Sequence, residues 1–339
     1  MAHILGIGVA TLDIINIVDH YPAEDEEMRA LEQRACPGGN AANTLHVLKQ
    51  LGHHCDLATV LAEEPDGDRL KNLLTQRGIG TDTCQRRSGR TPTSYITLNA
   101  TNGSRTIIHH RDLPELQASH VANLPLDRYD WIHLQARDTH TTSRILQTLR
   151  SHQPSHRPIS LEVEKDRDGV DMLFGQPDVI IFSRPFVLGR GYDEPEAFLR
   201  GIHKRVPGAI LISTWGEEGS WAWASRDGLY HAPACPPPQR HRHPRRRRHL
   251  QRRPHPHPRQ RRHRHPGPLQ RHPPGRPQGR PTRPRRPGHQ HPAKRRRQLR
   301  PDVSIQNLAI TYRAPEVHPG ARSPPPKPCD HPRPTRRAP

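Results

Sequence analysis

The sequence between residues 131 and 214 alternates short apolar segments with longer amphipathic ones, and this alternation constrains the fold most. Each apolar segment has strand length and is rich in β-branched residues, whereas the longer segments have helical spacing. Strands that alternate with helices at this spacing form βαβ units and therefore a parallel sheet. The predicted strands are 131–134, 159–163, 179–182 and 209–214, and the predicted helices are 141–151, 170–174 and 195–205.

The preceding part of the chain predicts the start of this sheet and a second, smaller one. An apolar run at 4–9 is typical of a buried first strand, and 56–61 and 66–77 read as a strand and a helix. Two β-rich segments flank an Asn102-Gly103 turn, which predicts a hairpin. The strands expected in the small sheet are 15–18, 29–33, 93–99 and 105–109.

The last hundred residues are a different kind of polypeptide. Of the 53 Lys and Arg residues in the 339-residue chain, 29 lie in 240–339, together with only three of the 33 acidic residues. The tail therefore carries a formal charge of +26 and the part before it −6. Low hydrophobicity and high charge cannot support a packed core, so we expect 239–339 to be a disordered Arg/Pro/His-rich tail.

Three short motifs precede the tail and can contact a ligand. A Pro-Gly-Gly-Asn-Ala-Ala-Asn segment at 37–43 joins two glycines to a predicted helix, on which Asn40 and Asn43 share a face. Asn side chains offer donors and acceptors that suit sugar hydroxyls, although a plain turn before a surface helix explains the segment about as well. Asp13 follows the first predicted strand, and the glycine-rich segment 214–219 follows the last, at the edge of a parallel sheet where ligands bind.

The sequence also indicates a compartment. No secretory leader and no membrane-length apolar run are evident, so we expect no membrane association. The five cysteines are odd in number and lack metal-ligand spacing, which is typical of a reducing compartment without structural zinc. These features predict a cytoplasmic protein.

In this order, the motifs resemble those of the ribokinase, or phosphofructokinase-B, family of sugar kinases. The resemblance covers about residues 3–238 and is strongest to the family's fructose-phosphorylating branch. It is carried further by segments 18–22, 102–107, 161–165 and 236–238. It implies an α/β fold, a three-layer α/β/α sandwich with a small β-sheet lid, which spans 1–238 and is truncated at its C-terminal side.

The resemblance also implies roles for matching residues in an ATP- and Mg²⁺-dependent transfer of phosphate to the 1-hydroxyl of fructose or a related ketose. Glu164 is a weaker match, to a position that organises magnesium through water. The lid implies a homodimer. The implied sugar contacts are Asp13, Gly39, Asn40 and Asn43, and the implied ATP contacts are Arg105, Gly216, Glu217, Glu218 and Gly219.

The family's anion hole and catalytic base have no counterpart after Pro238. The family pattern there is V-[ID]-D-T-x-G-A-G-D, in which backbone N–H groups stabilise the phosphoryl group and the last Asp accepts the sugar proton. Shifting the reading frame by one nucleotide, with allowed codons, converts 240–252 into V-I-D-T-L-G-A-G-D-T-F-N-A. We therefore interpret the tail as a frameshifted translation, either real or a sequencing error, in which Arg248 occupies the position of the base.

Two other functions compete with an active kinase. The chain could be an inactive, sugar-binding kinase remnant. The basic tail could instead bind nucleic acid, non-specifically through its arginines. Its single aromatic residue, Tyr312, provides no stacking platform for bases, and its spacing matches no nucleic-acid-binding module.

Overall fold

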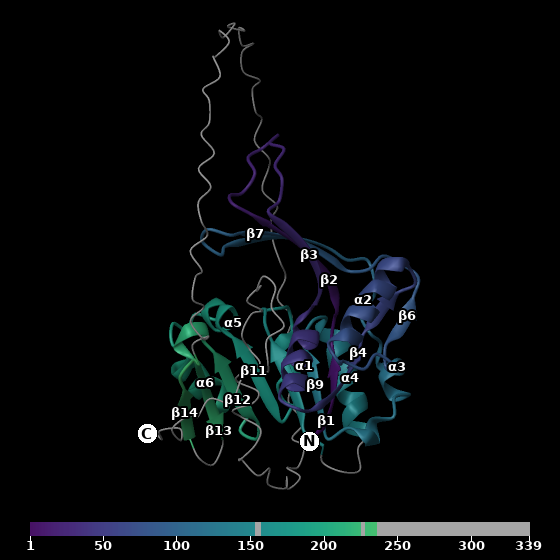
Figure 1. Cartoon of the computed structure of the whole chain (residues 1–339). Helices are drawn as coiled ribbons and strands as arrows, with labels where there is room; N and C mark the ends of the chain where they lie inside the picture. Colours follow the sequence, from purple (N-terminus) through teal and green to yellow (C-terminus); the bar gives the residue numbers. More distant parts are fainter. Residues whose placement is uncertain (153–156, 225–227, 236–339) are drawn as a thin grey trace, which may run out of the picture. The chain divides into compact units, whose positions relative to one another are not determined.

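An eight-stranded sheet organises the chain in the computed structural model, which describes residues 1–152, 157–224 and 228–235 (Figure 1). The strand order is β14-β13-β12-β11-β10-β9-β1-β4. The strands from β12 to β4 run parallel, as the alternation predicts, and β13 and β14 are antiparallel additions at one edge. The bounds are β1 (His3–Ile7), β4 (His54–Ala58), β9 (Trp131–Gln135), β10 (Ile159–Val163), β11 (Val179–Ser183), β12 (Ile210–Thr214), β13 (Ser220–Ala224) and β14 (Gly228–Ala232).

Helices pack on both faces of this sheet, as in the expected three-layer fold; among the described residues, those of the second face cover only its β1–β4 end. On one face, α3 (Ala118–Ala122), α4 (Thr139–Ser151), α5 (Arg184–Gly189) and α6 (Pro195–His203) bury a large core against the strands. On the other face, α1 (Asn40–Gln50) and α2 (Pro65–Gln76) bury a second core against β1 and β4. Short 3-10 turns complete the described chain: η1 (Leu126–Arg128), η2 (Val170–Leu173) and η3 (Gly216–Glu218).

Helix α1 lies unusually close to β1 because that strand and the turn after it carry glycines. A Cβ added at Gly6 would meet the Leu45 side chain at 2.7 Å, and one added at Gly8 would meet Ala41 Cβ at 2.6 Å. Both helix residues are fully buried. This close packing holds the first turn of α1 near the carboxyl end of β1.

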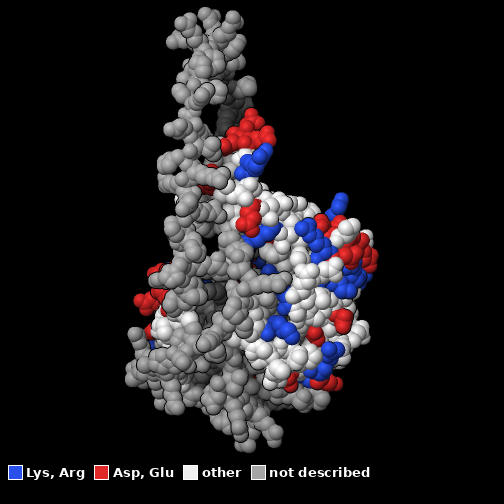
Figure 2. Space-filling model, viewed as in Figure 1, with Lys and Arg blue, Asp and Glu red and all other residues white. Residues whose placement is uncertain are grey.

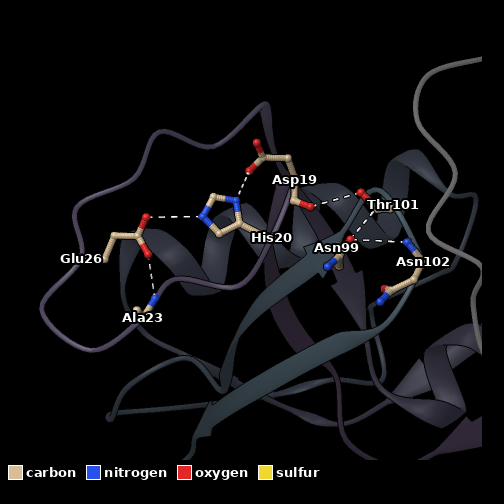
Figure 3. Close-up of polar contacts among 7 residues, drawn as sticks. All are labelled: Asp19, His20, Ala23, Glu26, Asn99, Thr101 and Asn102. Carbon is tan, nitrogen blue, oxygen red and sulfur yellow. Dashed lines mark hydrogen bonds and ion pairs between the residues drawn. The ribbon is translucent and has the colours of Figure 1, made fainter. Parts of the chain in front are cut away.

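The predicted small sheet is present and has the order β3-β2-β7-β8; we call it the lid. Its hairpin, β7 with β8, is antiparallel, as the Asn102-Gly103 turn predicts. The end of the lid is held by polar contacts between a loop and this turn (Figure 3): His20 lies between Asp19 (2.7 Å) and Glu26 (3.4 Å), and the Thr101 hydroxyl donates to the Asp19 carbonyl. The lid strands are β2 (Thr11–Val18), β3 (Glu32–Gly38), β7 (Thr93–Asn99) and β8 (Arg105–His110).

Several predicted boundaries are wrong. The expected strand 56–61 breaks at the buried Thr59, because pairing with β1 ends at Ala58 and the chain beyond continues as β5 (Val60–Ala62), which pairs with β6 (Gln85–Arg87) instead. The expected strands 15–18 and 29–33 are longer or shifted, because β2 and β3 pair along their length from Thr11↔Gly38 to Ile17↔Glu32. The expected helix 170–174 is a 3-10 turn, and α3, α5, β13 and β14 were not predicted.

The predictions for the tail, including its disorder and Arg248, lie outside the described residues, as does the boundary at 238. Within the described ranges, no helix is long and apolar enough to cross a membrane. Cys36, Cys55 and Cys84 carry free thiols.

Candidate active site

The carboxyl ends of the parallel strands meet along one edge of the main sheet, and the candidate residues gather there. In open α/β sheets ligands bind outside this edge. Glu162 and Glu164 lie at the end of β10, and the segment 216–219 follows β12. Helix α1 begins at the same edge, with Asn40 as its first residue.

Asp13 reaches this edge from the lid. The prediction put it just past the end of the first strand of the main sheet, but β1 ends at Ile7 and Asp13 lies within β2, opposite Cys36 of β3 and Ser94 of β7. The chain crosses between sheets here because the run from Thr11 to Val18 is rich in β-branched residues and pairs on both sides. The Asp13 carboxylate is thus held by the lid strands.

The two motif glycines let the lid and the main sheet approach each other. A Cβ at Gly38 would lie 2.1 Å from Asp13 Oδ2, and one at Gly39 would lie 2.0 Å from the Val9 carbonyl oxygen. Gly39 also has φ +96, a conformation that L side chains rarely adopt. Both glycines are therefore required by close contacts within the protein itself.

Burial and polar neighbours shift the pKa of Asp13 in opposite directions. Burial raises its pKa above the ordinary value. Hydrogen bonds from Thr11 (2.7 Å) and Ser94, and the charges of His109 and Arg77, act in the opposite direction. A half-buried carboxylate with these neighbours is well suited to accept hydrogen bonds from a polar ligand.

Asn40 links α1 to the end of β10. Its Nδ2 donates to Glu162 Oε1 at 2.5 Å and to Glu164 Oε2 at 3.1 Å. Asn40 and Glu164 were predicted to serve different ligands, a sugar and magnesium, and the structure brings them into direct contact. Glu164 is half-buried, and its backbone carbonyl accepts a 2.6 Å hydrogen bond from the Ser183 hydroxyl.

Glu162 is the most perturbed acid of this edge. Its side chain is completely buried, and Oε2 has no hydrogen-bond partner among the described residues. Burial, with a smaller contribution from the charge of Glu164, raises the pKa of Glu162 to about 8, although the Asn40 hydrogen bond lowers it. Perturbed acids of this kind concentrate at functional sites.

The candidate nucleotide residues form a tight turn after β12. The Trp215 N–H donates to the Gly219 carbonyl at 2.8 Å, and both Gly216 (φ +63) and Gly219 (φ +95) have left-handed backbone angles. Glu217 is exposed, and Glu218 pairs with Arg184 at 3.3 Å. The turn is therefore well defined, and its acidic side chains face solvent.

Two of the predicted site residues, Arg105 and Asn43, do not take part in these contacts. Arg105 is exposed at the start of β8, and within 1–152, 157–224 and 228–235 no hydrogen bond or ion pair joins it to the 216–219 turn. Asn43 lies in the first turn of α1, where its backbone N–H donates to Gly39, but its side chain has no hydrogen bond within the same ranges.

Three functional candidates escaped the sequence analysis. Glu162 occupies alternate strand positions with Ser160, a polar face in an otherwise apolar strand that could have been noticed. Arg77, just after α2, donates to the Pro37 carbonyl at 3.0 Å, and His109 lies 3.2 Å from the Ser94 hydroxyl. No local pattern marks these last two, because tertiary packing alone brings them to Asp13.

The visible surface carries charges of both signs (Figure 2). Exposed acidic residues gather in the lid loop at 24–27, and basic and acidic side chains are interspersed over the remaining described surface of this face. A nucleic-acid site needs a field of one positive sign. The described part of this face shows no such field.

The comparisons with known proteins agree with this architecture. Mouse ketohexokinase is 37% identical over 244 residues, which cover 70% of this chain and 82% of the mouse protein. Similar solved structures include a putative ribokinase from Agrobacterium tumefaciens (20% identity, TM-score 0.60, 69% and 77% of the two chains) and a ribokinase from Thermotoga maritima (20%, 0.57, 70% and 79%). Residues 1–240 match the model of the pfkB family of carbohydrate kinases, so the chain belongs to that family.

Proposed function

We propose that the chain derives from an ATP-dependent ketose kinase that phosphorylates fructose, or a related ketose, at its 1-hydroxyl. The observation that carries the proposal is the convergence of Asp13 beside Gly38 with Asn40 beside Glu164, at the carboxyl edge of the main sheet. The 37% identity to a ketohexokinase supports the choice of fructose among sugars.

In this proposal four residues contact the sugar: Asp13, Gly39, Asn40 and Asn43. Asp13 accepts hydrogen bonds from hydroxyl groups, and the Asn side chains complete the polar contacts. Gly39 leaves the start of α1 uncovered, because no side chain stands between the sugar and the helix N-terminus.

The nucleotide would bind beside the turn after β12. Arg105 from the lid would face the phosphates, and the backbone of Gly216, Glu217, Glu218 and Gly219 would line the nucleotide site. The use of ATP follows from membership of a kinase family. The proposal implies a cytoplasmic enzyme, with access to ATP and free ketose.

Glu164 fits a water-mediated magnesium contact. Within the described ranges, no group of three or more His, Cys, Asp or Glu side chains could hold a metal. Magnesium does not require such a group, since it retains several waters and binds through one or two carboxylates and the nucleotide phosphates. When bound, it would neutralise charge on the transferred phosphoryl group.

We propose further that the chain as written is impaired. Arg248 stands where the family has its base, and an arginine cannot accept a proton at any workable pH. Arg245 and Arg247 replace two glycines of the anion hole. Loss of a general base typically costs about 10²–10⁴-fold in rate, and loss of one oxyanion donor about 10²–10³-fold.

The test compares the full chain with a chain whose residues from 240 onward are read in the shifted frame. ADP release with fructose and Mg-ATP should be at least about 10⁴-fold faster for the frame-restored chain. Arg248→Asp in the chain as written is the matched control, and it should not restore turnover because the glycines are still missing. Comparable turnover from both chains would contradict the proposed impairment.

Calorimetry with fructose separates the remaining alternatives. Binding without turnover by the chain as written indicates a sugar-binding remnant. Absence of fructose binding in both chains overturns the proposed substrate. Binding of nucleic acid that is lost when residues 240–339 are removed would support the competing function of the basic tail.

We also propose a homodimer that forms through the lid. Strand β8 is exposed along its whole length, and Tyr95, Ile107 and Ile108 are among the most exposed large hydrophobic residues of the described chain. An exposed edge with apolar side chains favours association with another copy.

A further inference from the structure

A carboxylate that no predicted role uses lies directly beneath the proposed sugar site. Glu162 is fully buried, and its Oε1 lies 2.5 Å from Asn40 Nδ2. The backbone of Glu162 is held in the main sheet, since β10 pairs with β9 and β11 and the Glu162 carbonyl accepts the Ala136 N–H at 2.8 Å. The Glu162 carboxyl group is therefore held rigidly below the first residue of α1, with Oε1 as the acceptor.

A second acceptor makes the arrangement directional. Glu164 Oε2 lies 3.1 Å from the same nitrogen, so both N–H bonds of the Asn40 amide can be used by carboxylates. If the amide were flipped, its carbonyl oxygen would face Glu164 Oε2, and neither acid would receive the Asn40 N–H donors. Leaving such a group unpaired costs about 1–3 kcal/mol. In the structure the NH₂ group accordingly faces β10, and Asn40 Oδ1 faces away from it.

We propose that Glu162 is a positioning residue, which orients the Asn40 amide so that its carbonyl oxygen accepts a hydrogen bond from a sugar hydroxyl. The inference rests on the proposed function, in which Asn40 contacts the sugar. Within the described ranges, Asn40 Oδ1 forms no hydrogen bond of its own, so it is available to a ligand. The site then favours a ligand with a hydrogen-bond donor opposite Asn40 Oδ1.

The proposal predicts a specific pattern of discrimination among sugar analogues. A fluorine in place of a hydroxyl cannot donate, so the fructose analogue that is fluorinated at the contacted position should bind about tenfold or more weakly to the wild-type chain. When the amide is free to rotate, Asn40 can present its NH₂ group instead. The penalty for that fluorinated analogue should then shrink.

The experiment measures calorimetric binding of fructose and of its singly fluorinated analogues to the full chain and its variants. Glu162→Gln keeps an acceptor and should retain the wild-type order of affinities for fructose and its fluorinated analogues. Glu162→Met keeps the side-chain volume without an acceptor, so it should weaken fructose binding about tenfold and reduce the difference in affinity between fructose and the fluorinated analogue. Ser160→Ala is the matched control. Ser160 lies on the same face of β10 and bonds to Trp131 and His133, so this variant should leave the pattern unchanged.

A second measurement reports on the amide itself and needs no variant that could fail to fold. In the full chain with labelled asparagine, the Asn40 side-chain NH₂ protons should be protected from exchange, and added fructose should shift the carbonyl carbon more than the nitrogen. Rapid exchange of these protons, or an unchanged analogue pattern in Glu162→Met, would overturn the inference. If the wild type binds no fructose, the proposed function fails, and NH₂ protection still decides the role of Glu162.

Discussion

The main sheet and the lid are built from similar strands, yet they are stabilised very differently. Every residue of β10 and β11 is buried, with helices packed against one face of the sheet there, whereas every residue of β8 is exposed. The lid buries only a small cluster around Ile15, Ile17 and Ile96. The main body thus has far more buried apolar contact than the lid, whose strands meet it at the Gly38-Gly39 junction.

This difference matters because the proposed sugar site uses both regions. Asp13 comes from the lid, Asn40 and Glu162 come from the main body, and the Gly38-Gly39 pair joins them. The well-packed main body and the less tightly packed lid therefore meet at the site. Loops and lids that move during binding are typically drawn from the less stable parts of a protein.

The largest expected contrast concerns a core aromatic residue. Phe198 packs edge-on against Phe182, with ring centroids 4.9 Å apart, and Phe198→Ala should lower the free energy of unfolding by about 4 kcal/mol. Ile108 of the lid is 69% exposed, so Ile108→Ala should change the unfolding free energy of the monomer by less than about 0.5 kcal/mol. Urea unfolding followed by tryptophan fluorescence measures both, because all four tryptophans lie in or beside the main sheet. Equal losses of unfolding free energy in the two variants would contradict the difference between the main sheet and the lid.

The junction should be the next most sensitive feature. Gly39→Ala combines a strained φ with a Cβ placed 2.0 Å from the Val9 carbonyl oxygen, and it should cost about 3 kcal/mol. Gly103 in the lid hairpin also has a positive φ (+75), but a Cβ there meets nothing within 4 Å, so Gly103→Ala should cost about 1 kcal/mol. The same urea titrations test this order, and a reversed ranking would refute the importance of the junction.

The pH dependence of stability should also separate the two regions. Burial lowers the pKa of His133 in β9 from 6.5 to about 4, so the unfolded chain binds a proton that the folded chain does not. Stability is therefore lost as pH falls from about 6.5 to about 4, by roughly 3 kcal/mol. His133→Gln should flatten this decline. His109→Gln in the lid, where burial is partial, should flatten it less, and equal slopes for the two variants would contradict the assignment.

The smallest effect on stability should accompany a change of assembly. Ile107→Ser with Ile108→Ser removes apolar surface from β8, and we expect the proposed dimer to dissociate while the unfolding free energy of the monomer changes by less than about 0.5 kcal/mol. Sedimentation velocity measures the assembly. Met172→Ser is a control at a half-exposed position of the main body and should leave the dimer intact. A double variant that remains dimeric, or a monomeric wild type, would exclude the lid interface.

Local chemistry in the sequence by itself determined much of the architecture. Strand 159–163 was predicted with its observed bounds, and helices 66–77 and 141–151 were predicted to within two residues of α2 and α4. The Asn102-Gly103 turn determined the β7–β8 hairpin. These features depend on neighbours within a few residues, through hydrophobic period, capping and turn conformation, and such signals can be read without knowing the rest of the fold.

Only the tertiary structure decided where the candidate residues meet. Asp13 belongs to the lid because β2 pairs with β3 and β7, which lie about 20 and 80 residues further along the chain. Glu162 is buried against Asn40, 122 residues away in sequence, and the polar face that it shares with Ser160 does not identify that partner. Packing across such separations depends on how whole elements come together, so no local pattern of residue types could have identified the Asn40–Glu162 contact.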